Sequence, residues 1–218
     1  MLDLLKKFVK NKLMSSPGCH DWEHTQRVLH NALIIADAEA QHGPDLNVIA
    51  YAALLHDIAR SEELLADSKV CHAELGAQMV ADIFQKLNIL NVDPLIVAEC
   101  VRRHRYRNNK NIPETIEQKI IFDADKLDSL GAIGVARAIH FSGRIGSVLH
   151  NSKEIALNSE AYSKQDSAYR EYLVKLQYIP EKMLTDTGRV MAVERFDFMR
   201  LFFEQMNIEV DGANFKIH

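Results

Sequence analysis

The chain has 218 residues, of which 47% are hydrophobic and 26% charged, a composition typical of a globular protein that can bury a sizeable core. A formal net charge of −4 argues against a broad basic face, so duplex nucleic acid is not an expected partner. The three cysteines are odd in number and form no C-x-x-C pair, which predicts a reducing, cytoplasmic location. The sequence contains no apolar stretch of about 18 residues and no signal-peptide pattern, so no membrane-spanning segment is expected.

A helical hydrophobic period dominates the first 60 residues. Apolar residues at steps of three and four predict a helix over 2–13, which the SSPG segment at 15–18 stops. A second helix is expected over 22–42, ended by Gly43-Pro44. Residues 46–59 predict a strongly buried helix because VIAYAALL has almost no polar face. A strand is the alternative for this segment, but its length and its alanines favour the helix.

The middle of the chain continues as helices separated by polar segments. Residues 61–70 predict a loop with partial helix, and 105–113 predict a basic, Asn-rich loop. Between these loops the pattern predicts helices over 73–87 and 94–104. Asp93-Pro94 is a good start for the second of them, because an aspartate cap before a proline at the first helical position is favourable.

The remainder of the chain also lacks the alternation of a strand. The expected segments, in order, are a long helix over 114–141 interrupted near Gly131 and Gly134, a polar irregular segment over 143–167, and a helical region over 168–206 broken at Pro180 and around 185–188. The sequence therefore predicts an all-α fold.

His56 and Asp57 lie at the end of the most apolar predicted helix. Adjacent helical residues point about 100° apart, so both side chains can reach one point beside the helix. Burial of an ionised aspartate without a partner costs several kcal/mol, and a bound cation would offset that cost. The plainer alternative is a histidine at a helix C-terminus next to a solvated aspartate.

His20 and His24 lie four residues apart, on one face of a predicted helix, and this spacing allows both to bind one metal ion. Arg27 follows His24 by three residues on the same face and is a candidate for phosphate contact. The alternative is a helix cap formed by His20-Asp21, a surface position for His24 and a surface ion pair for Arg27.

Three carboxylates, Asp123, Asp125 and Asp128, follow the apolar run IIF. Aspartate is a poor helix former, so this clustering indicates a compensating cation. Asp125 and Asp128 are three residues apart and share a helix face. The alternative is a helix junction in which the aspartates cap the break near Gly131.

Taken together, these residues form the pattern H…HD…D, which resembles the HD-domain superfamily of metal-dependent phosphohydrolases. The segments HDWEHTQRV, AALLHDIAR and DADKLDSLGAIGVARAI are similar to blocks of a bacterial subfamily of small predicted HD hydrolases, in which nucleotide pyrophosphohydrolase activity with a divalent metal is known. Residues 175–212 are similar to the C-terminal helical block of that subfamily, so the resemblance covers most of the chain and is weakest over 108–114 and 147–167. It implies an HD-domain helical bundle over 1–145 and a C-terminal helical extension over 146–218, packed together as one compact unit.

The resemblance also implies a set of metal ligands. His24 is the first ligand, and His56 and Asp57 are the paired ligands. Asp125 is the last; it is preferred to Asp123 because an acidic residue follows it by three positions, as is usual in the family. His20 is then expected to be a hydrogen-bonding neighbour of the ligands.

His72 and His104 raise the question of a second ion. In binuclear members of the superfamily, extra histidines in similar blocks hold a second metal, whereas in mononuclear relatives polar residues there line the substrate pocket. The resemblance favours one metal slightly over two and keeps both readings open. Ordinary helix-end positions for both histidines are the third reading.

One departure from the family pattern concerns the general acid. Several nucleotide-cleaving HD enzymes carry a Glu or a Glu-Asp pair three and four residues after the motif aspartate, where this chain has Arg60 and Ser61. Glu62 and Glu63 follow slightly later. The sequence therefore assigns no general acid, and the substrate of those enzymes does not transfer directly.

The predicted activity is hydrolysis of a phosphoester or phosphoanhydride bond, most readily of a nucleotide, by a metal-activated water. The mixed nitrogen and oxygen ligands suit Mn, Fe, Co, Ni, Zn or Mg. Asp128 is expected to orient or deprotonate the water. The candidates to hold phosphate charge are Arg27, Lys126 and the group Arg102, Arg103, Arg105 and Arg107, which can also be read as a solvated basic loop.

A second class of function stays open at this point. The chain could be a catalytically silent, metal-containing module that binds a nucleotide or serves a regulatory role. In either case the expected partner is a small phosphorylated molecule, and a homodimer is left open.

Overall fold

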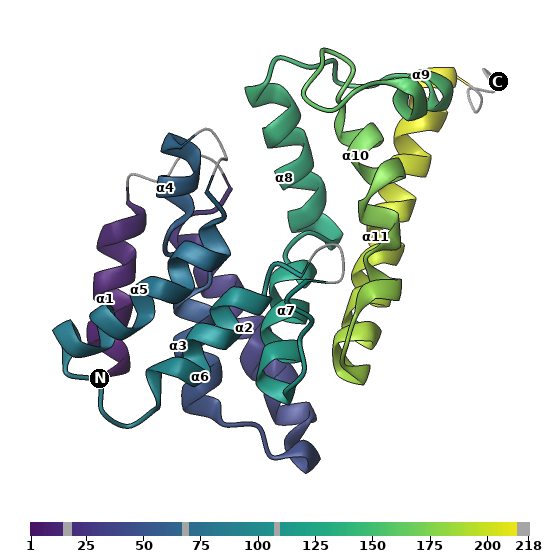
Figure 1. Ribbon diagram of the computed structural model, residues 1–218. Coiled ribbons are helices and arrows are strands. Elements are labelled where there is room, and N and C mark those ends of the chain that lie inside the picture. Colours follow the sequence, from purple (N-terminus) through teal and green to yellow (C-terminus); the bar gives the residue numbers. More distant parts are fainter. Residues whose placement is uncertain (15–18, 67–69, 107–109, 213–218) are drawn as a thin grey trace. The chain divides into compact units, whose positions relative to one another are not determined.

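The computed structural model describes residues 1–14, 19–66, 70–106 and 110–212, and no β-strand occurs among them (Figure 1). The prediction of an all-α fold is confirmed. The chain divides into two compact units: residues 1–128 with 183–188 form unit 1, and residues 129–182 with 189–218 form unit 2. The division into an HD bundle over 1–145 and an extension over 146–218 stays a prediction. None of the described helices is both long and apolar enough to cross a bilayer.

Unit 1 is a bundle of helices joined by short turns. Its elements are α1 (Leu2–Leu13), α2 (Trp22–Ala38), the 3₁₀ helix η1 (Ala40–His42), α3 (Leu46–Leu55), α4 (Arg60–Leu65), α5 (His72–Leu87), α6 (Pro94–Arg103) and α7 (Ile116–Leu127). The expected stop at residues 15–18 lies outside the described residues.

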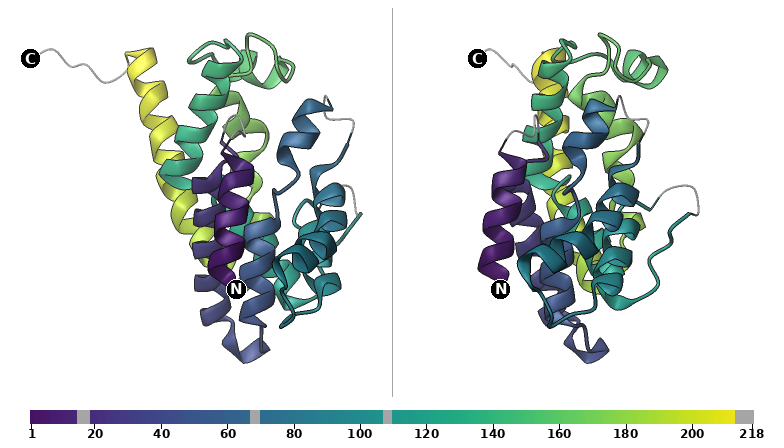
Figure 2. Two further views of the ribbon diagram at one scale, coloured as in Figure 1. Left: turned by 90° about the vertical axis from the view of Figure 1, so that its left-hand side faces the viewer. Right: turned by 60° about the vertical axis from the view of Figure 1, so that its left-hand side comes forward.

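Helix α3 is the centre of unit 1. Every residue from Val48 to Leu55 is buried, as expected for a helix without a polar face. It packs against α1, α2, α6 and α7, while α5 packs on α6; Figure 2 shows α1 beside this core from two further directions. Full burial of each large aliphatic side chain contributes about 1.5–3 kcal/mol, so α3 anchors the unit. The residues that follow α3 are consequently held in a fixed place.

Capping residues fix where the surrounding helices begin. The Asp21 carboxylate accepts a hydrogen bond from the His24 backbone N–H (2.8 Å) and starts α2. Asp93 caps α6 ahead of Pro94, which confirms that predicted start. Thr115 and Gln118 form a reciprocal capping box at the start of α7.

The buried helix predicted over 46–59 ends earlier than expected. α3 ends at Leu55, and the chain tightens into i→i+3 hydrogen bonds from Ile58 N to Leu55 O (3.1 Å) and from Arg60 N to Asp57 O (2.9 Å). A short helix, α4, then starts at Arg60 and accounts for the partial helix expected within 61–70. His56 and Asp57 therefore lie on a tight turn rather than inside a helix.

The helical region expected over 114–141 is interrupted just before Gly131, as predicted. α7 ends at Leu127, and α8 (Gly131–Arg144) starts at Gly131, whose φ of +66° is readily adopted only by glycine. The predicted second interruption at Gly134 is wrong, because Gly134 lies inside α8. A Cβ at this position would lie 2.2 Å from the Ser129 carbonyl oxygen, so the glycine serves close packing.

Unit 2 contains α8, α9 (Lys153–Asn158), α10 (Ala168–Val174), the 3₁₀ helices η2 (Leu176–Tyr178) and η3 (Pro180–Lys182), and α11 (Asp186–Asp211) from Arg189 onward. Aromatic stacking forms its core: the ring centroid of Tyr172 lies 4.6 Å from that of Phe203. In the segment predicted to be irregular, the Ser167 hydroxyl donates to Asn151 (2.7 Å) and Arg170 pairs with Asp166 (3.0 Å), so this segment is ordered by polar contacts.

Residues 183–188 connect the chain of unit 2 back to unit 1. The buried Asp123 carboxylate accepts hydrogen bonds from the backbone N–H of Leu184 (2.9 Å) and from the N–H and hydroxyl of Thr185 (2.8 and 2.7 Å). The N–H and hydroxyl of Thr187 donate to Glu39 (2.9 and 2.7 Å), and these bonds hold the pKa of Glu39 below its ordinary value. The predicted break around 185–188 is thus the start of α11, tied to α7 and to the end of α2.

Candidate metal centre

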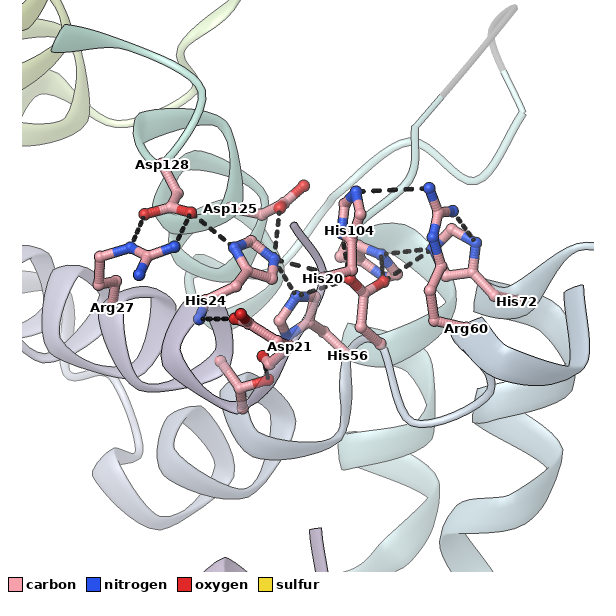
Figure 3. Close-up of polar contacts among 12 residues, drawn as sticks. His20, Asp21, His24, Arg27, His56, Arg60, His72, His104, Asp125 and Asp128 are labelled. Atoms are coloured by element: carbon pink, nitrogen blue, oxygen red, sulfur yellow. Dashed lines mark hydrogen bonds and ion pairs between the residues drawn. The ribbon is translucent and has the colours of Figure 1, made fainter. Parts of the chain in front are cut away.

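Four side chains from three separate segments converge in unit 1. His24 comes from α2, His56 and Asp57 from the turn after α3, and Asp125 from α7. His24 Nε2 lies 3.1 Å from His56 Nε2 and 3.6 Å from a carboxylate oxygen of each of Asp57 and Asp125 (Figure 3). His24, His56 and Asp125 thus form one group that could hold a metal ion, and Asp57 Oδ2 lies 3.6 Å from Nε2 of both of its imidazoles.

A second group of candidate ligands shares Asp57. His72 Nε2 lies 3.2 Å from His104 Nε2 and 3.1 Å from Asp57 Oδ1, and His104 Nε2 lies 3.7 Å from that same oxygen. The other oxygen, Asp57 Oδ2, faces His24 and His56 at 3.6 Å from each Nε2. Asp57 therefore stands between two positions that could each hold a cation.

The partners of the ring nitrogens fix the tautomers of three of the four histidines. His56 Nδ1 donates to the Ala53 carbonyl (2.7 Å) and His104 Nδ1 donates to the Val101 carbonyl (2.6 Å), because a carbonyl can only accept. His24 Nδ1 lies 2.7 Å from Asp128 Oδ2, which likewise accepts. In these three rings Nδ1 carries the proton and Nε2 presents a lone pair. His72 Nδ1 lies 2.9 Å from Glu63 Oε2 and 2.9 and 3.1 Å from the Nη1 donors of Arg60 and Arg105, so it faces both an acceptor and two donors.

The lone pairs face one another in buried surroundings. Two unprotonated nitrogens 3.1 Å apart cannot hydrogen-bond to each other, and the nearby carboxylates add negative charge. Such a buried set of acceptors is unfavourable without a donor or a cation between them. Imidazole nitrogens with carboxylate oxygens form a donor set suited to a divalent first-row transition metal, so the residues present fit a metal ion.

Burial favours the neutral form of three imidazoles at the centre, those of His20, His56 and His104. It lowers the pKa of His56, lowers that of His104 well below its ordinary value, and lowers that of His20 to about 4. Burial alone would raise the pKa of Asp57 and of Asp125. The surrounding imidazoles, and for Asp125 above all Lys126, outweigh burial and hold both carboxyl pKa values well below their usual range. Neutral imidazoles and ionised carboxylates are the forms that bind a metal ion.

Asp128 and Arg27 lie on the far side of His24 from the other ligands. Arg27 donates from Nε to Asp128 Oδ1 (2.6 Å) and from Nη2 to Asp128 Oδ2 (3.1 Å), and Oδ2 also accepts from His24 Nδ1. Asp128 is buried, and both of its oxygens are engaged. Since its contact is with Nδ1, the carboxylate lies at the opposite edge of the imidazole from the ligating Nε2 (Figure 3).

Glu63 occupies the equivalent place behind His72 and was not identified from the sequence. It is buried, lies 2.9 Å from His72 Nδ1 through Oε2, and pairs with Arg60 (2.5 Å) and with Arg105. The contact between Glu63 and Arg105 spans 42 residues. It depends on the unexpected turn between α3 and α4, so the sequence offered no signal for it.

The two candidate aspartates of α7 point to different partners. Asp125 faces His24 and also pairs with Lys126 (2.7 Å), whereas Asp123 binds the 183–188 segment. His20 Nδ1 lies 2.7 Å from Asp57 Oδ2, in contact with a candidate ligand as expected.

The arginines predicted to hold phosphate charge around residues 102–107 have different partners in the structure. Arg102 pairs with Glu74 (2.9 Å) and with Glu99, and Arg103 pairs with Glu99 (3.1 Å). Arg105 alone among its described members contacts the centre, through Glu63 and beside His72. Arg107 lies outside the described residues.

Comparison with known proteins adds three findings. The family model of the HD domain matches residues 21–130, the range that contains the predicted ligands His24, His56, Asp57 and Asp125. The uncharacterised protein YpgQ of Bacillus subtilis strain 168 is 32% identical over 214 residues, which cover 96% of this chain and 94% of that protein. The crystal structure of YpgQ in complex with ADP has a TM-score of 0.73 at 28% identity and covers 98% of this chain and 100% of that one.

A further solved structure agrees in fold. The crystal structure of an HD-superfamily hydrolase from Bacillus thuringiensis has a TM-score of 0.72 at 27% identity, with 96% of each chain covered. The matches to YpgQ and to this hydrolase extend through both units, whereas the HD domain model ends just after α7.

Proposed function

Because this chain belongs to the HD domain family, we propose that it is a metal-dependent phosphohydrolase that cleaves a phosphoester or phosphoanhydride bond with a metal-activated water. One observation carries the proposal: the Nε2 lone pairs of His24 and His56 face each other at 3.1 Å, with Asp57 and Asp125 beside them. A divalent ion bound there polarises a phosphoryl oxygen and lowers the pKa of a bound water toward about 7.

The candidate ligands form two groups, and each group could bind one metal ion. His24, His56, Asp57 and Asp125 would hold the first ion, and Asp57, His72 and His104 would hold a second. The donor types do not select one metal, so Mn, Fe, Co, Ni, Zn and Mg all remain suitable. The support for the second position is its own pair of facing Nε2 atoms, 3.2 Å apart.

The charges around the centre favour an anionic substrate. Each carboxylate outside the shared Asp57 has a cationic partner: Asp128 has Arg27, Asp125 has Lys126, and Glu63 has two arginines. Since these carboxylates are already paired, a divalent ion leaves the centre positive, and a phosphate group would compensate this charge.

A nucleotide is the substrate class that we propose. The support is the relative YpgQ, which has been crystallised with ADP and matches this chain over nearly its whole length. Cleavage of a phosphoanhydride or a phosphoester bond of a nucleotide is consistent with this size and charge of ligand.

Asp128 and Arg27 are proposed to position His24. The contacts of Asp128 are with Arg27 and with the Nδ1 edge of His24, so it orients the imidazole and increases its basicity. This role replaces the general base expected from the sequence, since a base must reach the attacking water.

The proposal is tested by a panel of nucleoside mono-, di- and triphosphates after chelation of resident metal and reloading with single divalent metals. Hydrolysis that requires metal and is lost in His56→Ala supports it. The alternative, a catalytically silent nucleotide-binding or regulatory module, predicts zero turnover together with stoichiometric nucleotide binding that survives His56→Ala.

A further inference from the structure

We infer that Arg60 and Arg105 form an anion-binding pair next to the His72 end of the metal centre, and that they hold a phosphate group adjacent to the one that reacts. This inference rests on the proposed function and narrows it to substrates with consecutive phosphates. It assigns a role to Arg60, at the position where the sequence departs from the acidic residue of related enzymes.

The two arginines reach the same place from different segments. Arg60 is the first residue of α4, and Arg105 follows the end of α6. Arg60 Nη1 lies 2.5 Å from Glu63 Oε2, and Arg105 Nη1 donates to Glu63 Oε1. Both guanidinium groups thus share one carboxylate and lie side by side over it.

The pair lies one imidazole ring away from the second candidate metal position. Arg60 Nη1 is 2.9 Å and Arg105 Nη1 is 3.1 Å from His72 Nδ1, while Nε2 of the same ring faces His104 and Asp57. Arg60 Nη2 also lies 3.4 Å from His20 Nε2. Figure 3 shows Arg60 and His72 at one end of the row of ligands, with Arg27 and Asp128 at the other.

The exposure of the three side chains differs in a way that suits ligand binding. The Glu63 side chain is 5% exposed, whereas those of Arg60 and Arg105 are 21% and 22% exposed. The carboxylate is therefore buried beneath two guanidinium groups that reach the surface. Each of them contacts Glu63 through a single Nη1 atom, and a guanidinium carries five N–H donors.

The net charge of Arg60, Arg105 and Glu63 favours binding of a further anion. Glu63 neutralises one guanidinium, and the charge of Asp57, across His72, is offset by the divalent cation that it would bind, so the metal-loaded group of Arg60, Arg105 and Glu63 keeps a surplus positive charge. If the arginines served only to neutralise Glu63 and so orient His72, one of them would suffice. A phosphate accounts for the second, because guanidinium groups match the oxygens of phosphate in geometry and charge.

The position of the pair predicts the substrate class. One phosphoryl group is held at the metal positions, and the arginines bind beyond His72, so the ligand carries a second phosphate next to the first. A nucleoside di- or triphosphate meets this requirement, and a nucleoside monophosphate does not.

The test is calorimetric binding of methylenediphosphonate, a non-hydrolysable analogue of two linked phosphates, to the metal-loaded full chain. Since each guanidinium would make charge-assisted hydrogen bonds to the diphosphonate, Arg105→Ala and Arg60→Ala should each weaken binding about tenfold or more at unchanged metal content. Inorganic phosphate should lose much less affinity. The matched control is Arg200→Ala, which removes a surface arginine paired with Glu204, and its binding should equal that of wild type.

A double-mutant cycle of Arg105 and Glu63 distinguishes binding of the ligand by Arg105 from neutralisation of Glu63 by Arg105. If Arg105 only neutralises Glu63, Arg105→Ala should have no effect in a Glu63→Gln background; the inference requires that the loss of diphosphonate affinity persists there. Arg105→Lys keeps the charge and should recover part of the affinity, even if Arg105→Ala disturbs the metal content. Wild-type affinity in both alanine variants would overturn the inference. The readout does not depend on turnover, so an inactive wild-type protein would count against the proposed function alone.

Discussion

Nε2 of His24 and Nε2 of His56 lie 3.1 Å apart, and the proton of each ring is held at Nδ1 by another partner. Neither nitrogen can donate to the other, so the contact is not a hydrogen bond between them. Asp128 fixes the first ring and the Ala53 carbonyl fixes the second, which means that the fold turns both lone pairs toward one point.

Asp57→Ala should abolish both metal content and hydrolysis while far-ultraviolet circular dichroism stays helical. Asp57 directs one carboxylate oxygen toward each candidate metal position, so its loss removes a ligand from both. Elemental analysis and turnover measure the two effects. Asp82→Ala, on the exposed face of α5, is the matched control and should keep both. Normal turnover by Asp57→Ala would rule out this site.

Asp128→Asn should weaken metal binding about 10–100-fold, because partners of the non-ligating ring nitrogen tune metal affinity to this degree. The amide removes the negative charge that supports the His24 N–H. Metal titration of the variant distinguishes two roles. A general base would instead show unchanged metal affinity with a reduced kcat, and that outcome would restore the role first expected from the sequence.

The metal-free protein should lose stability as the pH falls from about 7 to 5. The folded-state pKa of His20 is lowered to about 4, and those of His56 and His104 are lowered too, so the unfolded chain takes up protons first. This stability is complete above the unfolded pKa of about 6.5 and is lost below it. At about 1.4 kcal/mol per pKa unit, His20 alone contributes on the order of 2–3 kcal/mol.

Urea unfolding of the chelated protein at several pH values measures this effect. Asp57 and Asp125 act in a different window, since their lowered pKa values remove stability only below about pH 3.8. A free energy of unfolding that stays constant between pH 7.5 and 5 would contradict the neutral, buried state of these histidines.

A fragment of residues 1–145 should be unstable and should bind metal poorly. It lacks the N–H and hydroxyl donors of 184–187, which satisfy the buried carboxylates of Asp123 and Glu39. Loss of the partners of one buried charge costs about 3–5 kcal/mol, and Asp123 lies two residues from Asp125 on the same helix. Thermal unfolding and metal titration of the fragment test this expectation. A fragment as stable and as metal-competent as the full chain would show that the HD bundle folds independently.

The sequence was informative where local chemistry is unusual. His56-Asp57 after a fully apolar helix and clustered aspartates within a helix are locally unfavourable arrangements, so they indicate a ligand without knowledge of the fold. The all-α class followed from the hydrophobic period alone. Glu63 and the pairing of Asp123 with Thr185 could not be foreseen, because they join residues distant in sequence through turns whose bounds the pattern does not fix.

The same limit explains the reassignment of Asp128. Its spacing from Asp125 places both on one helix face, which suggested a shared approach to the metal. In the structure, α7 ends at Leu127, and the Asp128 carboxylate reaches the outer edge of His24 instead. Sequence spacing therefore identified the neighbourhood of this residue, and only the three-dimensional contacts indicate which atom it serves.

The most direct test of the central claim is an anomalous difference map from crystals of the protein loaded with manganese. We expect a strong peak within about 2.0–2.3 Å of His24 Nε2 and of His56 Nε2, with Asp57 and Asp125 completing the set of ligands. A map with no peak between these two nitrogens at full metal loading, or with manganese bound only elsewhere on the chain, would contradict it.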